Sequence, residues 1–269
     1  MFTKKVNYYF IYALVFLFVL VANPEQHYQI ILACGYSALF CIVAYIIGWL
    51  TLDGTKSAWI LGWIAFGLGQ LAVAAVLAAF FVSSSLLSKQ PDASVVSVRR
   101  NARQVWANGF WLVLFVMIWF ASEDTIWLYA GIASMATATA DTWATEIGGH
   151  RFQGTTYLIY GLKKTTPGTD GGISVAGTLA SLAGSALIAA TCLFVLPESS
   201  LLDFFFIAFA GFMGSLADSL LGATKQGKHL ELPPVMGNIM ECNIDNDFVN
   251  WAATGTGALS FLILSMFTL

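Results

Sequence analysis

The stretch YQIILACGYSALFCIVAYIIGWL, residues 28–50, carries no charged side chain and is long enough to cross a lipid bilayer as one helix. Runs of similar length and composition recur along the 269 residues. Hydrophobic residues make up 58% of the chain and charged residues only 10%, whereas a soluble domain carries about 25% charged residues. Alternating ten-residue segments typical of an outer-membrane barrel are not seen. We therefore predict an all-α fold, a polytopic helical membrane bundle.

About eight membrane spans are expected, within a single transmembrane domain that covers residues 1–269. The expected spans are residues 6–22, 28–50, 58–82, 104–121, 125–147, 172–196, 203–225 and 246–268. Lys4 and Lys5 precede the first apolar run in the manner of a signal peptide, but no clear cleavage motif follows. We interpret this run as a first helix.

The basic residues indicate an orientation. Eight single spans place the three long connections, residues 83–103, 148–171 and 226–245, on one side of the membrane. Counting Lys225 at a span end, that side holds nine of the twelve basic residues. Basic residues favour the cytoplasm, so the long connections are expected there and both termini outside. Lys4 and Lys5 conflict with this arrangement.

Several functional classes are disfavoured. A formal net charge of −3 gives no reason to expect a nucleic-acid partner. The four cysteines have no CxxC spacing, and three of them lie inside apolar spans, so we interpret them as buried thiols. The three histidines show no metal-ligand spacing.

Charged side chains inside membrane spans are costly and therefore indicate function. Asp141 and Glu146 lie near the cytoplasmic end of the fifth expected span, and Asp218 lies at similar depth in the seventh. On a regular helix Glu146 is rotated by about 140° from Asp141. Both can line one cavity only if the helix ends or unwinds, as Gly148 and Gly149 permit.

A glycine-rich connection leads into the sixth expected span, with the sequence GLKKTTPGTDGG at residues 161–172. Gly168, Gly171 and Gly172 allow backbone N–H groups to face a ligand, and the following helix begins with its positive dipole end. Lys163 and Lys164 add positive charge. Although this is not a P-loop sequence, the loop and the two aspartates together favour a phosphate and Mg²⁺ site, in which carboxylates hold the metal.

Five segments carry a family resemblance: RNARQVWANG (100–109), ADTWATEIG (140–148), PGTDGGISVAGTLASLAGS (167–185), GSLADSLLGATKQ (214–226) and NDFVNW (246–251). They resemble the membrane family that contains the plant chloroplast phytyl-phosphate kinase of vitamin E recycling and a related animal transmembrane protein. A more distant similarity is to CTP-dependent phytol and dolichol kinases.

The resemblance implies an Mg²⁺-dependent phosphotransferase that converts a prenyl monophosphate, such as phytyl or geranylgeranyl phosphate, to the diphosphate with CTP or ATP. Asp141 and Asp218 would hold the metal, and Glu146 would join them in catalysis. The residues implied to bind nucleotide phosphates are Lys163, Lys164, Gly168, Thr169, Gly171 and Gly172. Those implied to bind the acceptor are Arg103, Asn108, Gln226, Asn246 and Asn250.

Two other classes fit the same residues. A transporter of a phosphorylated solute or a cation also uses intramembrane aspartates and glycine-broken helices, although its site would lie near the membrane midplane. A catalytically inactive lipid-binding protein is the third alternative. The sequence does not define the prenyl chain length, the nucleotide, an alcohol against a monophosphate acceptor, or the oligomeric state.

Overall fold

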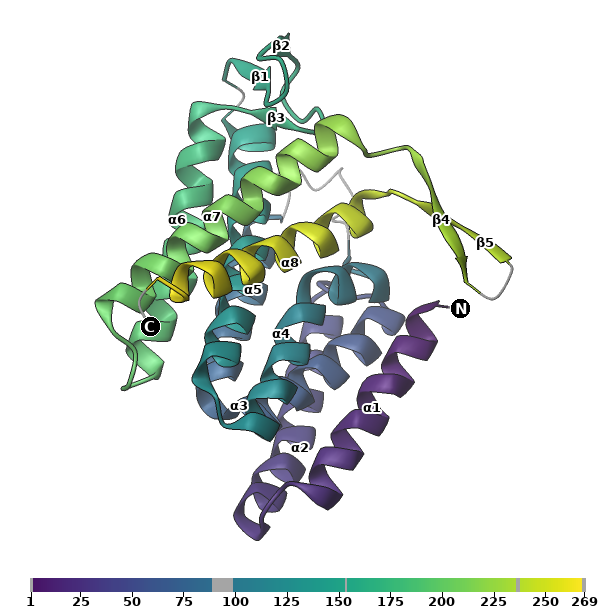
Figure 1. Cartoon of the computed structure of the whole chain (residues 1–269), viewed down its shortest axis with the longest axis vertical. Helices are drawn as coiled ribbons and strands as arrows, with labels where there is room; N and C mark the ends of the chain where they lie inside the picture. Colours follow the sequence, from purple (N-terminus) through teal and green to yellow (C-terminus); the bar gives the residue numbers. More distant parts are fainter. Residues whose placement is uncertain (1, 89–98, 153, 236–237, 268–269) are drawn as a thin grey trace.

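The computed structural model describes residues 2–88, 99–152, 154–235 and 238–267. In this part the chain forms eight α-helices, one π-helix and five short strands, and it is a polytopic helical membrane bundle, as expected (Figure 1). The α-helices are α1 (Phe2–Leu20), α2 (Pro24–Ile46), α3 (Leu52–Leu87), α4 (Ala102–Ser122), α5 (Thr125–Trp143), α6 (Val175–Val195), α7 (Leu201–Thr224) and α8 (Asn246–Ser265).

Among the described residues, six helices are long and apolar enough to cross a membrane: α2, α3, α4, α6, α7 and α8. Helix α5 falls outside this group because it is rich in Ala and Thr, which are less apolar than Leu, Ile or Phe. It packs against α3, α4, α6, α7 and α8, and all residues from 130 to 140 are buried. Small side chains suit a helix that meets other helices rather than lipid, because they let backbones approach closely.

One threonine of α5, Thr137, packs against a glycine on each of two neighbouring helices. A methyl group added at Gly214 of α7 or at Gly257 of α8 would overlap the Thr137 side chain. The absence of side chains at these two positions therefore sets how closely α7 and α8 approach α5.

We expected one straight span over residues 58–82. Helix α3 is instead broken within this range. A straight helix of 36 residues would be about 54 Å long. The Phe81 ring nevertheless makes an edge contact with the ring of Trp49, which precedes the helix, with 5.7 Å between the ring centres. The break is at Gln70, with φ 56° and ψ −163°. At this residue the chain reverses, so α3 is a helical hairpin.

Hydrogen bonds with α2 fix the first half of this hairpin. The indole N–H groups of Trp59 and Trp63 donate to the carbonyl oxygens of Cys34 (3.0 Å) and Ile30 (2.8 Å), so the first half runs antiparallel to α2. The break at Gln70 frees a carbonyl at Phe66. The Gln29 side chain donates to that oxygen at 3.2 Å, which compensates for the interrupted helical bond.

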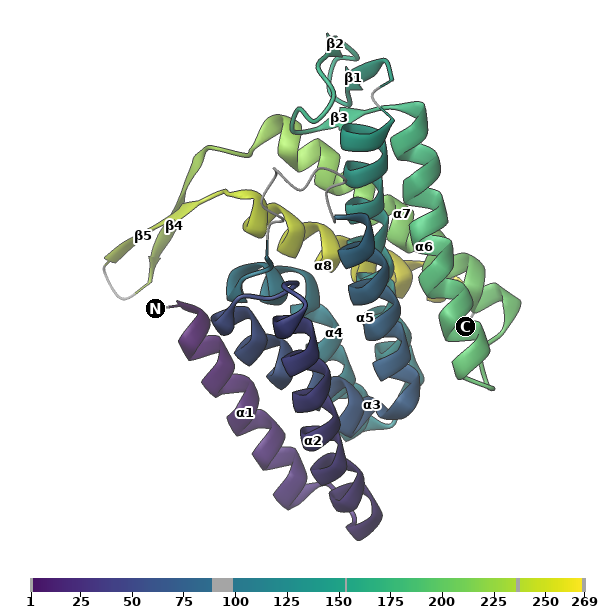
Figure 2. The same cartoon turned by 180° about the vertical axis from the view of Figure 1, so that it is seen from behind.

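Because α3 reverses, the amino terminus lies at the other end of the bundle from the one expected for eight single spans. The Asn7 Oδ1 atom of α1 accepts hydrogen bonds from Ser57 at the start of α3 and from Trp106 at the start of α4. Figures 1 and 2 both show the N-terminus on the same side as strands β4 (His229–Val235) and β5 (Asn238–Asn243). The expectation that both termini share the side opposite the long connections is therefore wrong.

We call the end of the bundle with the three long connections the loop end. Arg151 of the second connection donates to the Leu87 carbonyl beside the first, at 2.8 Å. Arg103, next to the first connection, pairs with Asp245 of the third. Two small antiparallel sheets lie at this end: β4 with β5, and β1 (Thr156–Leu158) between β2 (Lys164–Thr165) and β3 (Gly172–Ile173).

The basic residues of the described part of the chain all lie at one end of the bundle. With Lys89 outside the described residues, the other eleven basic residues lie at the loop end, including Lys4, Lys5 and Lys56, which the single-span arrangement placed opposite. The links at the far end carry only acidic residues: Glu25, Glu123, Asp124, Glu198 and Asp203.

Candidate active site

Two aspartates face each other at the loop end. Asp141 lies two residues before the end of α5, and Asp218 lies six residues before the end of α7. Their carboxyl groups are within hydrogen-bonding reach of each other. The Oδ2 atom of Asp218 is buried and has no hydrogen-bond donor in the part of the chain that the structure describes. Two adjoining carboxylates with an unsatisfied oxygen form a donor set that suits a cation.

Both aspartates line a cavity of about 130 Å³. Its walls come from the end of α5, the first turns of α6, the last turns of α7 and the glycine-rich loop. Eight of the site residues expected from the sequence line it: Asp141, Gly168, Thr169, Gly171, Gly172, Asp218, Gln226 and Asn246. The structure therefore brings together residues spread over more than a hundred positions.

The glycine-rich loop forms one wall. Gly168 and Gly171 have φ of +83° and +73°, a backbone region in which glycine is favoured. The N–H groups of Thr169 and Gly172 donate within the loop, to Thr166 O and Thr169 O. Among the described residues, no acceptor engages the N–H groups of Gly168, Asp170 and Gly171. Two of the three glycine amides, together with the amide of Asp170, thus remain for a ligand.

The start of α6 forms the adjacent wall. The Ser174 hydroxyl caps the helix by accepting from the Gly177 N–H at 3.1 Å. Thr178 and Ser181 follow along the cavity wall, and the Ser181 hydroxyl is buried without a partner in the described part of the chain. A helix amino end with free hydroxyls favours an anion such as phosphate.

Helix α5 continues as the π-helix η1 (Ala144–Arg151), so the unwinding that the glycines permit does occur. It does not bring Glu146 to the cavity. Thr145, Gly148 and Gly149 line the cavity, whereas the Glu146 carboxylate pairs with the His150 ring at 3.1 Å. The placement of Glu146 beside the two aspartates is therefore not found.

Other expected residues also lie elsewhere. Lys163 and Lys164 are exposed and do not line the cavity. Arg103 pairs with Asp245 and Asp247. Asn108 lines a separate pocket between α2, α3 and α4, and Asn250 is absent from both linings.

Asp170 is a cavity residue that the sequence reasoning missed. It lies between Thr169 and Gly171 in the loop, close enough to Asp218 for their charges to interact. Its position within the PGTDGG segment was the available signal. Ser215 and Ser219, which lie one helical turn or less from Asp218, also line the cavity.

The donor set limits which metal the cavity can hold. Among the described residues, no group of three or more His, Cys, Asp and Glu side chains forms a metal cage. Mg²⁺ is commonly bound by one or two carboxylates together with substrate phosphates and water. The pair formed by Asp141 and Asp218 fits this requirement and does not fit a closed structural zinc site.

A family model described as integral membrane protein DUF92 matches residues 35–258, from α2 to α8. The chain belongs to this family. Among DUF92 relatives, an uncharacterised membrane protein of Synechocystis is 33% identical over 190 residues, which cover 66% of this chain and 73% of the relative. No solved structure matches the chain.

Two DUF92 relatives are from Arabidopsis thaliana. Protein PGR is 31% identical over 238 residues, covering 76% of this chain and 81% of the relative. Protein VTE6, chloroplastic, is 27% identical over 237 residues, covering 82% of this chain and 66% of the relative. These matches confirm the family membership inferred from the five sequence segments.

Proposed function

We propose that the protein is a membrane-embedded phosphotransferase that moves the γ-phosphoryl group of a nucleoside triphosphate, CTP or ATP, to a prenyl monophosphate. The observation that carries the proposal is the cavity at the loop end, where Asp141 and Asp218 face the glycine-rich loop and the start of α6. The family resemblance, which includes a phytyl-phosphate kinase, supplies the substrate class.

The depth of the cavity suits such a substrate. Asp218 is six residues from the end of α7, or about 9 Å along the helix axis, so the cavity lies near the membrane surface. A prenyl phosphate places its head at that level and its tail in the bilayer. A transporter site would lie closer to the midplane, and this difference favours the enzyme.

Each wall of the cavity has a role in the proposed reaction. The amides of Gly168, Asp170 and Gly171 and the start of α6 would bind nucleotide phosphates. Asp141 and Asp218 would hold Mg²⁺, which supplies charge neutralisation during phosphoryl transfer. Gln226 and Asn246 can donate to an acceptor phosphate. An acceptor oxygen would bond to the γ-phosphorus as the bond to the β-phosphate oxygen breaks, releasing the nucleoside diphosphate.

We also propose that the loop end faces the cytoplasm. Each half of α3 spans about 26 Å, close to the thickness of a hydrocarbon core of about 30 Å. If both halves cross, the chain makes nine crossings rather than eight, and its termini lie on opposite faces. Lys4 and Lys5 then agree with the other basic residues under the positive-inside rule.

The decisive experiment is to incubate the purified protein with radiolabelled CTP or ATP, Mg²⁺, and a panel of prenols and prenyl phosphates. Label is expected in a prenyl diphosphate, and it should be lost in Asp141→Asn. The absence of transfer from either nucleotide to every acceptor would reject the proposal. Solute flux across proteoliposomes that depends on Asp141 would favour the transporter.

A further inference from the structure

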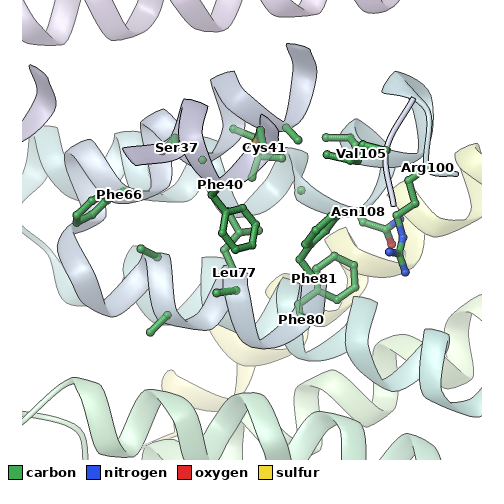
Figure 3. Close-up of a pocket in the computed structure, with 18 of the residues that line it drawn as sticks. Ser37, Phe40, Cys41, Phe66, Leu77, Phe80, Phe81, Arg100, Val105 and Asn108 are labelled. Atoms are coloured by element: carbon green, nitrogen blue, oxygen red, sulfur yellow. The ribbon is translucent and has the colours of Figure 1, made fainter. Parts of the chain in front are cut away.

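A second cavity, of about 310 Å³, lies between α2, the two halves of α3 and α4. It shares no lining residue with the cavity of Asp141. The reversal of α3 at Gln70 creates it, because residues from both halves of the hairpin form its walls. Figure 3 shows Phe66 at one end of the pocket and Arg100 with Asn108 at the other.

Most of the wall is apolar, and part of it is open to the side. Phe66, Leu77, Phe80 and Phe81 contribute to the lining. Two lining side chains remain accessible, with 44% exposure for Phe40 and 72% for Leu71. In a membrane protein such exposed apolar groups face lipid, so the pocket opens towards the hydrocarbon phase.

One cation closes the loop end of the pocket. The Arg100 guanidinium donates to the Ser85 hydroxyl and lies 5.7 Å from the centre of the Phe81 ring. No carboxylate forms an ion pair with it in the described part of the chain. Burial lowers the pKa of Arg100, and the Glu146 charge partly offsets this effect, but an arginine remains protonated at physiological pH. Arg100 is half-buried, and a cation partly withdrawn from water without an anionic partner is costly.

The amide side chains of Gln104 and Asn108 line the same end. The pocket thus has a polar, cationic end level with the membrane surface and an apolar end that extends towards the membrane interior. A lipid in that leaflet has the same polarity along its length. The volume lies at the small end of the range of about 300–1,000 Å³ that ligand pockets span, which favours one chain over two.

We propose that this pocket binds a membrane-dissolved, single-chain amphiphile with an anionic head, which pairs with Arg100, while the chain lies along Phe81, Leu77 and Phe66. The site differs from the cavity of Asp141 in every lining residue. Its occupancy therefore does not depend on the proposed phosphoryl transfer.

The test uses the full-length protein in phosphatidylcholine nanodiscs, without nucleotide, and a hexadecyl phosphate that carries a photoreactive diazirine in mid-chain. Labelled peptides are expected to map to the pocket walls in α2 and α3. Unlabelled hexadecyl phosphate should compete at concentrations about tenfold or more below those of hexadecanol or a two-chain phosphatidic acid, because only the first ligand has both features.

Two variants test separately the contribution of the Arg100 charge and that of the pocket volume to ligand binding. Arg100→Gln removes the charge, and Ala78→Phe fills the pocket; each should reduce specific labelling by about 10- to 100-fold. Arg99→Gln is the matched control, because Arg99 is exposed beside Gly48 rather than in the pocket; its labelling should equal that of the wild type.

Mapping of the wild-type adducts does not depend on any variant folding. Adducts spread over lipid-facing helices such as α1 and α6 would overturn the proposal. Equal competition by phosphatidic acid would also overturn it, because an ordinary bilayer lipid would then be the occupant. Activity measured in parallel distinguishes this result from failure of the phosphotransferase proposal, since labelling requires no transfer.

Discussion

Replacing Gln70 with glycine should stabilise the protein. Gln70 holds φ 56° and ψ −163°, a region that is almost restricted to glycine and costs a larger residue about 1–3 kcal/mol. Its side chain is exposed, so truncation removes little packing. Glycine loses more backbone entropy on folding, about 0.5–1 kcal/mol relative to alanine. The net effect of Gln70→Gly is then a gain of about 1 kcal/mol.

The measurement is reversible unfolding of the purified protein in mixed micelles with increasing denaturing detergent, followed by tryptophan fluorescence. Gln70→Ala is the control, because it removes the same side chain and keeps the strain, so it should leave stability nearly unchanged. Gln70→Pro should prevent folding, since proline fixes φ near −65°. If Gln70→Gly is no more stable than Gln70→Ala, the conclusion that Gln70 holds a strained backbone conformation in α3 is wrong.

Four further predictions follow from the fold and the site. Protease-cleavable tags at the two termini should be accessible from opposite faces of sealed vesicles; accessibility from one face would contradict nine crossings. Asp141→Asn should reduce prenyl-phosphate phosphorylation by several orders of magnitude without loss of stability, and EDTA should abolish wild-type activity; an active variant would exclude the shared-metal role. Lys164→Ala should leave the nucleotide KM nearly unchanged, because Lys164 is exposed and does not line the cavity; a large rise in KM in steady-state kinetics would show that the lysine binds the nucleotide. Gly257→Ala should destabilise the bundle by about 1–3 kcal/mol through overpacking, and Thr137→Ala should restore most of this loss in detergent unfolding.

The sequence predicted the helical class and most helix boundaries because apolar length is a strong signal for membrane spans. It failed at α3, where both halves of the hairpin are apolar and the break has no proline or charge. The segment FGLGQ at residues 66–70 was the available signal. Gly67 and Gly69 are compatible with a close helix contact as well as with a reversal, so this segment alone does not distinguish the two.

The candidate site was predicted in part. Asp141 and Asp218 could be paired from the sequence because both are intramembrane carboxylates at similar depth on parallel spans. Glu146 could not be assigned, because its direction depends on the geometry of η1, which an ideal helix does not reproduce. Nor could the sequence show that Arg103 has its own acidic partners, since Asp245 and Asp247 lie more than 140 positions away.

The packing of α5 connects the fold to the site. Asp141 reaches Asp218 only because α5 and α7 approach closely along their length, and Gly214 opposite Thr137 permits that approach one turn below the aspartates. A larger residue at Gly214 would separate the helices and with them the two carboxylates. Substitution at Gly214 should therefore lower metal affinity as well as stability, whereas substitution at Gln70, in the distant hairpin, should change stability alone. This difference distinguishes residues that shape the cavity from residues that shape only the bundle.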